Sequence, residues 1–212
     1  MGRVLDYFAG LDVYGWLEVL AMAVGIYYVF LEIRKTKLLW YVCILTSVLN
    51  MFVYQHNNYL SMTLIQFYYV ATSVYGLYSF SRIREEAAAE GRQVAIRRFD
   101  WKVGGIALVL GIAAFFLLVP LLQRYGAAHP GMVLFPSQPY WDAFIAVGSM
   151  VGTFFLSKSY MCQWYVWIVL DLVTVGVFVY SGMYWMAVMY LIYVVLCFIG
   201  IRNWRANGVY VD

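Results

Sequence analysis

The chain has 212 residues, of which 65% are hydrophobic, 20% are aromatic and only 12% are charged. A soluble domain is about 45–50% apolar and about 25% charged, and a domain of this length could not hide so much apolar surface from water. This composition therefore predicts a protein surrounded by lipid. It excludes a secreted disulfide scaffold, a standard cytosolic enzyme and a nucleic-acid-binding domain, for which the net charge of +3 is also too small.

Seven continuously apolar segments follow one another along the chain, each about as long as a helix needs to cross a bilayer. They cover residues 13–31, 38–54, 59–80, 103–122, 141–156, 161–180 and 184–200. Because the runs are continuous and not alternating, they predict helices and not the strands of a β-barrel. We expect an all-α membrane protein with seven transmembrane helices, of which the first is retained and is not a signal peptide.

The basic residues predict the orientation of the seven spans. Only Arg3 and Arg124 fall on the side of the N-terminus, and the other twelve Lys and Arg residues fall on the opposite side. These twelve are Arg34, Lys35, Lys37, Arg82, Arg84, Arg92, Arg97, Arg98, Lys102, Lys158, Arg202 and Arg205. By the positive-inside rule we expect the N-terminus outside and the C-terminus in the cytoplasm.

The segments between the spans are short, and the longest is the cytoplasmic connector 81–102. Its stretch 84–92, REEAAAEGR, predicts a short interfacial helix. We interpret the connector as a solvated segment near anionic lipid, with a regulatory site as the alternative. All four prolines are expected at the end of the fourth span or in the external loop that follows it, and they are Pro120, Pro130, Pro136 and Pro139.

An internal repeat relates the second and third spans to the sixth and seventh at an offset of 124 residues. Trp40, Cys43, Ser47, Asn50 and Tyr54 have the same spacing as Trp164, Trp167, Asp171, Thr174 and Phe178. The same offset pairs Gln66 with Tyr190, Tyr69 with Tyr193 and Gly76 with Gly200. Chance similarity between aromatic-rich helices is the alternative. We expect a 3+1+3 parallel repeat, SWEET-like and typical of secondary transporters.

The repeat divides the chain into three parts. Residues 1–80 are expected to form the first three-helix bundle, and residues 141–212 are expected to form the second bundle and the cytoplasmic tail. Residues 81–140 then contain the connector, the linking fourth helix and the external loop.

Asp171 is the strongest candidate for a functional residue. It falls near the middle of the sixth span, where an ionised carboxylate costs about 2.5–3.5 kcal/mol, and the seven spans contain no Lys, Arg or His. Asp171 is therefore either protonated and hydrogen-bonded, or it meets a cationic ligand or a carried proton. Trp164 and Trp167 share its helix face and favour a planar, partly aromatic cation.

Polar side chains of other spans could complete a ligand site or could hold helices together. The candidates for substrate binding are Asn50, Thr63, Gln66, Tyr69, Tyr190 and Tyr193, with Glu18, Ser47, Ser73 and Thr174 as secondary candidates. The three cysteines have no metal-binding spacing, and no catalytic motif is present. We therefore expect transport without chemistry, and neither a metal site nor a cofactor.

Three stretches resemble the PnuC family of bacterial vitamin transporters, and the resemblance covers nearly the whole chain. They are residues 66–78 of the third span, Trp164 to Asp171 of the sixth span, and residues 190–204 at the end of the seventh. The resemblance implies a seven-helix, SWEET-like inner-membrane protein, usually a homotrimer. It implies that nicotinamide riboside, a pyridinium cation, passes by facilitated diffusion and is trapped by a cytoplasmic riboside kinase as a precursor of NAD.

Two alternatives remain open at this point. Some members of the family carry thiamine, another ringed cation, or other vitamins, and the residues of this chain do not exclude them. Transport could also be coupled to protons through Asp171.

Overall fold

The computed structural model describes residues 13–56, 60–89, 95–133, 135–182 and 184–210. Within these ranges the chain forms seven α-helices, one short 3-10 helix and two short strands. In chain order they are α2 (Val13–Ile33), α3 (Leu38–His56), α4 (Leu60–Ala89), β1 (Ala95–Ile96), α5 (Trp101–Ala128), η1 (Pro130–Met132), α6 (Gln138–Ser157), α7 (Gln163–Tyr180), α8 (Tyr184–Asn207) and β2 (Val209–Tyr210). The expected all-α class with seven helices is confirmed.

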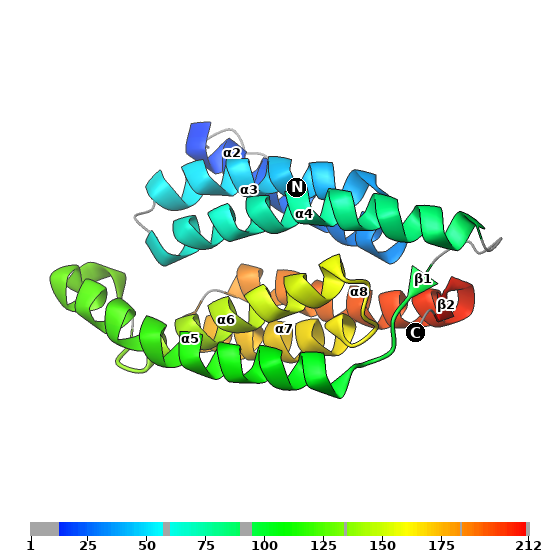
Figure 1. The fold of residues 1–212 in the computed structure, drawn as a ribbon. Coiled ribbons are helices and arrows are strands. Elements are labelled where there is room, and N and C mark those ends of the chain that lie inside the picture. The colour runs from blue at the N-terminus through cyan, green and yellow to red at the C-terminus, as the bar shows by residue number, and fades with distance from the viewer. Residues whose placement is uncertain (1–12, 57–59, 90–94, 134, 183, 211–212) are drawn as a thin grey trace.

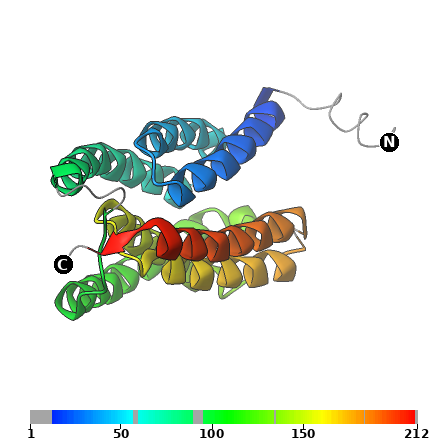
Figure 2. The ribbon, with the colours of Figure 1, turned by 90° about the vertical axis from the view of Figure 1, so that its right-hand side faces the viewer.

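The helices form two layers. Helices α2, α3 and α4 lie together in one layer, and α5, α6, α7 and α8 lie in the other, as Figures 1 and 2 show from two directions. Within the layers α3 packs on α2 and α4, and α7 packs on α6 and α8. Between the layers α2 packs on α8, and α4 packs on α6. Helices α2 and α4 therefore form the first layer's side of the interface between the layers.

A tryptophan packs on a glycine in each layer. A Cβ atom added to Gly76 of α4 would lie 2.6 Å from the indole of Trp40 on α3, and one added to Gly200 of α8 would lie 2.5 Å from the indole of Trp164 on α7. Both indoles are almost completely buried. Glycine lets neighbouring membrane helices approach closely. The two contacts are separated by the same 124 residues along the chain.

The turn before α3 and the turn before α7 are also alike. Lys35 and Ser159 are the two non-glycine residues with a positive φ among those described, at 49° and 64°. The N–H of Thr36 donates to the carbonyl of Leu31 at 3.2 Å, and that of Tyr160 donates to the carbonyl of Phe155 at 2.9 Å. Helices α2 and α6, which precede these two turns, thus each end as in a Schellman motif, with a left-handed residue and a six-to-one hydrogen bond.

Apolar side chains cover the outside of the bundle. Among the described residues, four helices are long and apolar enough to cross a membrane, namely α5, α6, α7 and most of α8, and shorter apolar helices cover Ala23–Ile33 and Leu38–Phe52. Helix α5 is the most exposed, and Leu117 at its middle keeps 76% of its surface accessible. Its apolar surface fits a lipid environment and not water.

Several helices extend beyond the apolar spans that predict them. Helix α4 continues to Ala89, so this part of the 84–92 stretch is the end of a long helix and not a separate short one. Helix α5 contains Pro120 and continues to Ala128, so Pro120 does not end it. Hydropathy marks the thickness of the hydrocarbon core, whereas residues with good helix propensity, such as those of 85–89, can continue a helix outside it.

One end of the bundle is basic, and it contains Lys35, Arg98, Lys158 and Arg205. Strand β1 pairs in parallel with β2, and Arg97 bridges to Tyr160. The indole N–H of Trp204 on α8 donates to the carbonyls of Glu32 and Ile33 at 3.2 and 3.1 Å. The Lys35 ammonium lies 5.0 Å from the centre of the Trp204 indole. These contacts tie the end of α8 both to the connector and to the end of α2.

Candidate functional site

Asp171 lies in the second layer on α7, and its side chain is only 5% exposed. The thiol of Cys197 on α8 lies 3.9 Å from its Oδ2 atom, within reach of a weak S–H donation. This is the one side-chain hydrogen bond to Asp171 among the described residues. A weak thiol donor leaves most of the hydrogen-bonding capacity of the carboxylate unused.

A second buried carboxylate, Glu32, lies close to Asp171 from the first layer. Glu32 is in the last turn of α2, is 3% exposed, and is close enough to Asp171 and Cys197 to interact with both electrostatically. Its Oε1 atom is buried without a hydrogen-bond partner. The neighbouring Gln163 is fully buried, and its side-chain amide lies within hydrogen-bonding reach of the Glu32 carboxyl group. Two carboxylates and an amide thus meet at the interface between the layers.

Small polar side chains of α3 and α4 lie on the first-layer side of these groups. The thiol of Cys43 neighbours Ser47, Ser73 and the hydroxyl of Tyr28, and it interacts electrostatically with Glu32. Ser47 and Ser73 are both buried, within hydrogen-bonding reach of the Cys43 thiol. We call the whole group the interlayer cluster; it contains Tyr28, Glu32, Cys43, Ser47, Ser73, Gln163, Asp171 and Cys197.

The interlayer cluster holds two carboxylates and no Lys, Arg or His side chain. Lys35 lies nearby, in the turn between α2 and α3, but its ammonium group packs over the Trp204 ring. Burial, and after it the positive charge of Arg97, lowers the pKa of Lys35 from its usual 10.5 to about 7. Burying unpaired carboxylates is expensive, whereas a cationic ligand would compensate their charge. The cluster is therefore suited to a cation or to protons.

The tyrosines proposed from the sequence lie along the same interface. Tyr193 of α8 reaches across to α2, where a Cβ atom added to Gly25 would lie 3.0 Å from its hydroxyl oxygen. The Tyr190 and Tyr193 rings are 5.5 Å apart and meet edge to face. Tyr69 of α4 interacts electrostatically with Tyr28 of the cluster. Tyr193 of the second layer thus contacts α2 of the first, and Tyr69 neighbours the cluster through Tyr28.

The two tryptophans next to Asp171 in the sequence pack in other directions. Trp164 lies on Gly200 and meets the Trp204 ring edge to face at 5.4 Å, and the indole of Trp167 lies on Gly152 of α6. The indole nitrogens of both are buried without a hydrogen-bond partner. Each indole thus has one donor to offer.

The other candidates are distributed unevenly. Gln66 is buried on α4, Asn50 and Thr63 are half-buried, and the Thr174 hydroxyl donates to the Leu170 carbonyl of its own helix at 2.8 Å. That bond supports the interpretation of Thr174 as a structural residue. The side chain of Glu18 lies outside the described part of the structure.

Sequence reasoning missed Glu32 and Gln163. Glu32 follows directly after the first predicted span, 13–31, so the apolar pattern does not place it inside the membrane. Helix α2 continues to Ile33 and carries Glu32 into the bundle. If each predicted span is extended by one helical turn, Glu32 falls within the first span. Nothing in the sequence marks Gln163 as buried.

Comparison with known proteins identifies the family of the chain. A family model described as nicotinamide mononucleotide transporter matches residues 15–206. The chain belongs to this family. The nicotinamide riboside transporter PnuC of Escherichia coli K12 is 24% identical over 203 residues, which cover 89% of this chain and 84% of that protein. The riboflavin/roseoflavin transporter RibM of Streptomyces davaonensis is 26% identical over 189 residues, with the same coverage.

A solved structure shares the fold. The crystal structure of the vitamin B3 transporter PnuC matches with a TM-score of 0.63 at 16% sequence identity, over 96% of this chain and 86% of that one. The predicted membership of the PnuC family is confirmed, and the chain is a multi-pass membrane protein of this fold.

Proposed function

We propose that the protein takes up nicotinamide riboside across the bacterial inner membrane and that Asp171 and Glu32 bind its positive charge. The observation that carries this proposal is the pair of buried carboxylates in a cluster without a basic side chain. A ligand that brings its own positive charge would balance them, and nicotinamide riboside carries one on its pyridinium ring. The family and the similarity to the Escherichia coli transporter support this substrate.

The other groups at the interface suit the rest of such a ligand. The buried amide of Gln163 and the buried hydroxyl of Ser73 could pair with the carboxamide or the ribose hydroxyls. Tyr190 and Tyr193 offer aromatic faces for the pyridinium ring, which cation–π attraction favours. Gln66, Asn50, Thr63 and Tyr69 on the first layer and Trp164 and Trp167 on the second are proposed as further contacts.

The proposed transport cycle moves one layer against the other. Asp171 and Glu32 are both buried between the layers, so a ligand reaches them only when the layers part on one side of the membrane. Matching Trp–Gly contacts and matching turns support two equivalent three-helix units, α2–α4 and α6–α8, joined by α5. Rocking of such units about a central site gives alternating access. The protein would bind, release and reorient, and would not alter the substrate.

The direction of uptake follows from orientation and trapping. Lys35, Arg98, Lys158 and Arg205 all lie at the basic end, which we assign to the cytoplasm by the positive-inside rule. Phosphorylation by a cytoplasmic kinase would then retain a riboside that enters by facilitated diffusion. The homotrimer implied by the family resemblance belongs to the same proposal.

A flavin is the second candidate substrate, because the Streptomyces relative is a riboflavin/roseoflavin transporter. Riboflavin is uncharged at neutral pH and would leave both carboxylates of the cluster without a counter-ion. Thiamine, in contrast, is a ringed cation and fits the charge as well as nicotinamide riboside does. The charge of the substrate therefore separates riboflavin from the other two vitamins, and ring shape must separate the two cations.

Uptake by the purified protein in sealed proteoliposomes tests the proposal. Labelled nicotinamide riboside should enter down its own gradient without ATP, and excess unlabelled nicotinamide riboside should compete more strongly than thiamine or riboflavin. If an imposed pH gradient drives accumulation of nicotinamide riboside in the vesicles, transport is coupled to protons and is not facilitated diffusion. Uptake of riboflavin alone would overturn the cation assignment, and no uptake of any of the three would overturn the substrate class.

A further inference from the structure

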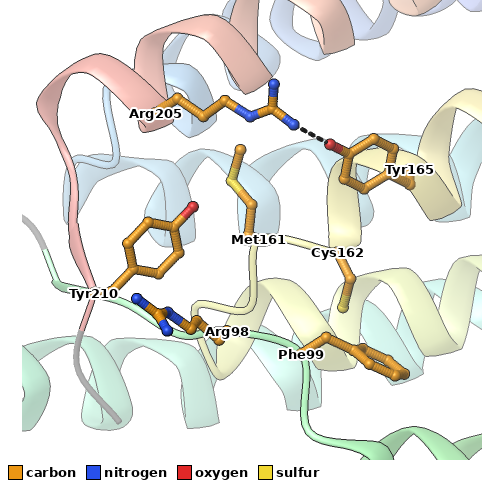
Figure 3. A pocket seen from close by; sticks show the side chains of 7 residues that line it. All are labelled: Arg98, Phe99, Met161, Cys162, Tyr165, Arg205 and Tyr210. Carbon is orange, nitrogen blue, oxygen red and sulfur yellow. Dashed lines mark hydrogen bonds between the residues drawn. The ribbon is translucent and has the colours of Figure 1, made fainter.

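A pocket opens at the basic end, away from the interlayer cluster. It has a volume of about 420 Å³ and is lined by Arg98, Phe99, Met161, Cys162, Tyr165, Arg205 and Tyr210. Figure 3 shows that these side chains come from three segments far apart in the sequence: the connector before α5, the turn leading into α7, and the end of α8 with β2. Met161 is buried at the pocket, whereas both arginines are exposed.

Backbone hydrogen bonds fix the positions of these three segments. The N–H of Arg97 donates to the carbonyl of Ser159 at 2.8 Å, and the N–H of Met161 donates to the carbonyl of Arg97 at 3.0 Å. On the other side of the connector, Ile96 pairs with Tyr210 in the parallel strands, and its side chain is fully buried. Arg98 follows directly on this doubly paired segment. The pocket is therefore built on fixed backbone and does not depend on a loose loop.

The pocket is positively charged and has aromatic walls. A guanidinium nitrogen of Arg205 donates to the Tyr165 hydroxyl at 2.6 Å, and the guanidinium of Arg98 lies 5.2 Å from the centre of the Tyr210 ring. No acidic residue is among the described residues that line the pocket. Arg98 and Arg205, each with five donors, thus lie on opposite sides of one pocket (Figure 3). Arginine suits a phosphate group, because its guanidinium can bind two phosphate oxygens at once.

The pocket borders the lipid-facing surface of the protein. The rings of Phe99 and Trp101 meet edge to face at 5.0 Å, and Trp101, the first residue of α5, is 84% exposed. Tryptophan at the end of an apolar helix typically lies at the level of the lipid headgroups. Helix α5 continues from there with its apolar side chains exposed. A lipid lying along α5 would therefore have its headgroup beside Arg98.

We propose that this pocket binds a phosphate group, supplied by an anionic phospholipid of the cytoplasmic leaflet. The phosphate bridges Arg98 of the connector and Arg205 of α8, and the acyl chains lie along α5. Because Arg98 belongs to the connector and Arg205 to α8, a bound lipid ties the start of α5 to the end of α8. A free phosphate ester in the cytoplasm offers the same chemistry, so the experiment separates the two sources.

Native mass spectrometry of the full-length protein in detergent tests the proposal with phosphatidylglycerol and phosphatidylcholine as probes. We expect wild-type protein to retain phosphatidylglycerol at least about fivefold more than phosphatidylcholine, since charge-assisted bidentate contacts are strong. The double variant Arg98→Gln/Arg205→Gln should lose this preference. Arg202→Gln is the matched control, because Arg202 is exposed on α8 but does not line the pocket.

Competition with inorganic phosphate and with a soluble phosphomonoester identifies the source. If millimolar phosphate leaves phosphatidylglycerol bound, the lipid is the ligand; if phosphate binds and displaces it only in proteins with both arginines, the site is a phosphate site for soluble esters. Equal retention of phosphatidylglycerol by wild type and double variant would overturn the proposal. Thermal unfolding without added lipid shows that the variants are folded, and a stabilisation by phosphatidylglycerol that survives in the double variant would also overturn it.

Discussion

The helix pairs α3–α4 and α7–α8 have the same scaffold but different polar groups. Trp40 on Gly76 corresponds to Trp164 on Gly200, and the left-handed Lys35 corresponds to Ser159. Where α3 and α4 carry the neutral Ser47 and Ser73, the equivalent positions of α7 and α8 carry Asp171 and Cys197. The carboxylate in the second unit is thus an addition to a frame that both units share.

The first unit contributes its carboxylate at a different place. Glu32 lies in the last turn of α2. The residue 124 positions later is Leu156, which is buried in the last turn of α6. The two units therefore each supply one buried acid, from positions that the repeat does not relate. This difference teaches that the two helix groups share packing residues but not the positions of their buried acids.

The shared frame can be broken at its glycines, where the largest effect is expected. Gly200→Ala and Gly76→Ala should each destabilise the protein by about 1–3 kcal/mol, because the new methyl group would overlap a buried indole. Gly176→Ala on α7 is the control, since nothing lies within 4 Å of its added Cβ. Thermal unfolding in detergent measures all three. A large effect at one glycine and none at the other would contradict equivalent units.

The charge difference can be removed by Asp171→Asn, which keeps the shape of the side chain. Binding of nicotinamide riboside should weaken at least about tenfold, or 1.4 kcal/mol, because the ligand loses a buried counter-ion. Asp142→Asn is the control: this half-buried carboxylate on α6 accepts a hydrogen bond from Gln138 at 3.3 Å, outside the cluster. Calorimetry should show unchanged affinity for the control. Equal affinity of the Asp171 variant would remove Asp171 from the site.

The turn before α3 contains Lys35, whereas the turn before α7 has the uncharged Ser159 at the same place. The stability of the protein should therefore depend on pH through Lys35. The pKa of Lys35 is lowered to about 7 in the folded protein, so the unfolded state binds more protons between pH 7 and 10.5. Stability should therefore rise with pH above 7, by about 1 kcal/mol from pH 7 to 8. Lys35→Ser introduces the residue of the equivalent turn and should flatten this slope.

Chemical denaturation at several pH values measures the effect of Lys35, with Lys37→Ser as the control in the same loop, where Lys37 is exposed. The control should keep the slope of the wild type. A slope that is unchanged in Lys35→Ser would show that another group causes it.

Glu32→Gln tests the second carboxylate and should have the smallest effect. We expect affinity for nicotinamide riboside to fall about threefold, because Asp171 remains while one of two attractive charges is lost. The double variant with Asp171→Asn should lose less than the product of the single effects if the two acids bind one charge. Independent effects in this double-mutant cycle would place Glu32 outside the ligand site.

The sequence predicted the parts of the structure that depend on local pattern. Seven apolar runs predicted seven helices, and an acid with no basic partner predicted Asp171 as buried. Glu32 was not predicted, because hydropathy locates the end of a span only to within about one helical turn, and Glu32 lies one residue beyond the predicted end. The pairing of β1 with β2 had no signal either, since two-residue strands more than a hundred residues apart leave no periodicity.

The site itself was only partly predictable. Asp171 is buried as expected, whereas the packing of Trp164 and Trp167 on glycines of neighbouring helices cannot be predicted from one helix alone. Sequence spacing places residues on one helix face but does not say which neighbour that face meets. The layers also bring Glu32 next to Asp171, which only tertiary packing determines.

The most direct test compares nicotinamide riboside with its reduced 1,4-dihydro form, which has nearly the same shape but no positive charge. Calorimetric binding to the wild type should favour the charged form by at least about tenfold, and Asp171→Asn should remove most of this preference. Riboflavin and thiamine titrated into the same sample place the substrate among the vitamins of the family. Equal binding of the charged and uncharged forms to the wild type would contradict a cation site at Asp171 and Glu32.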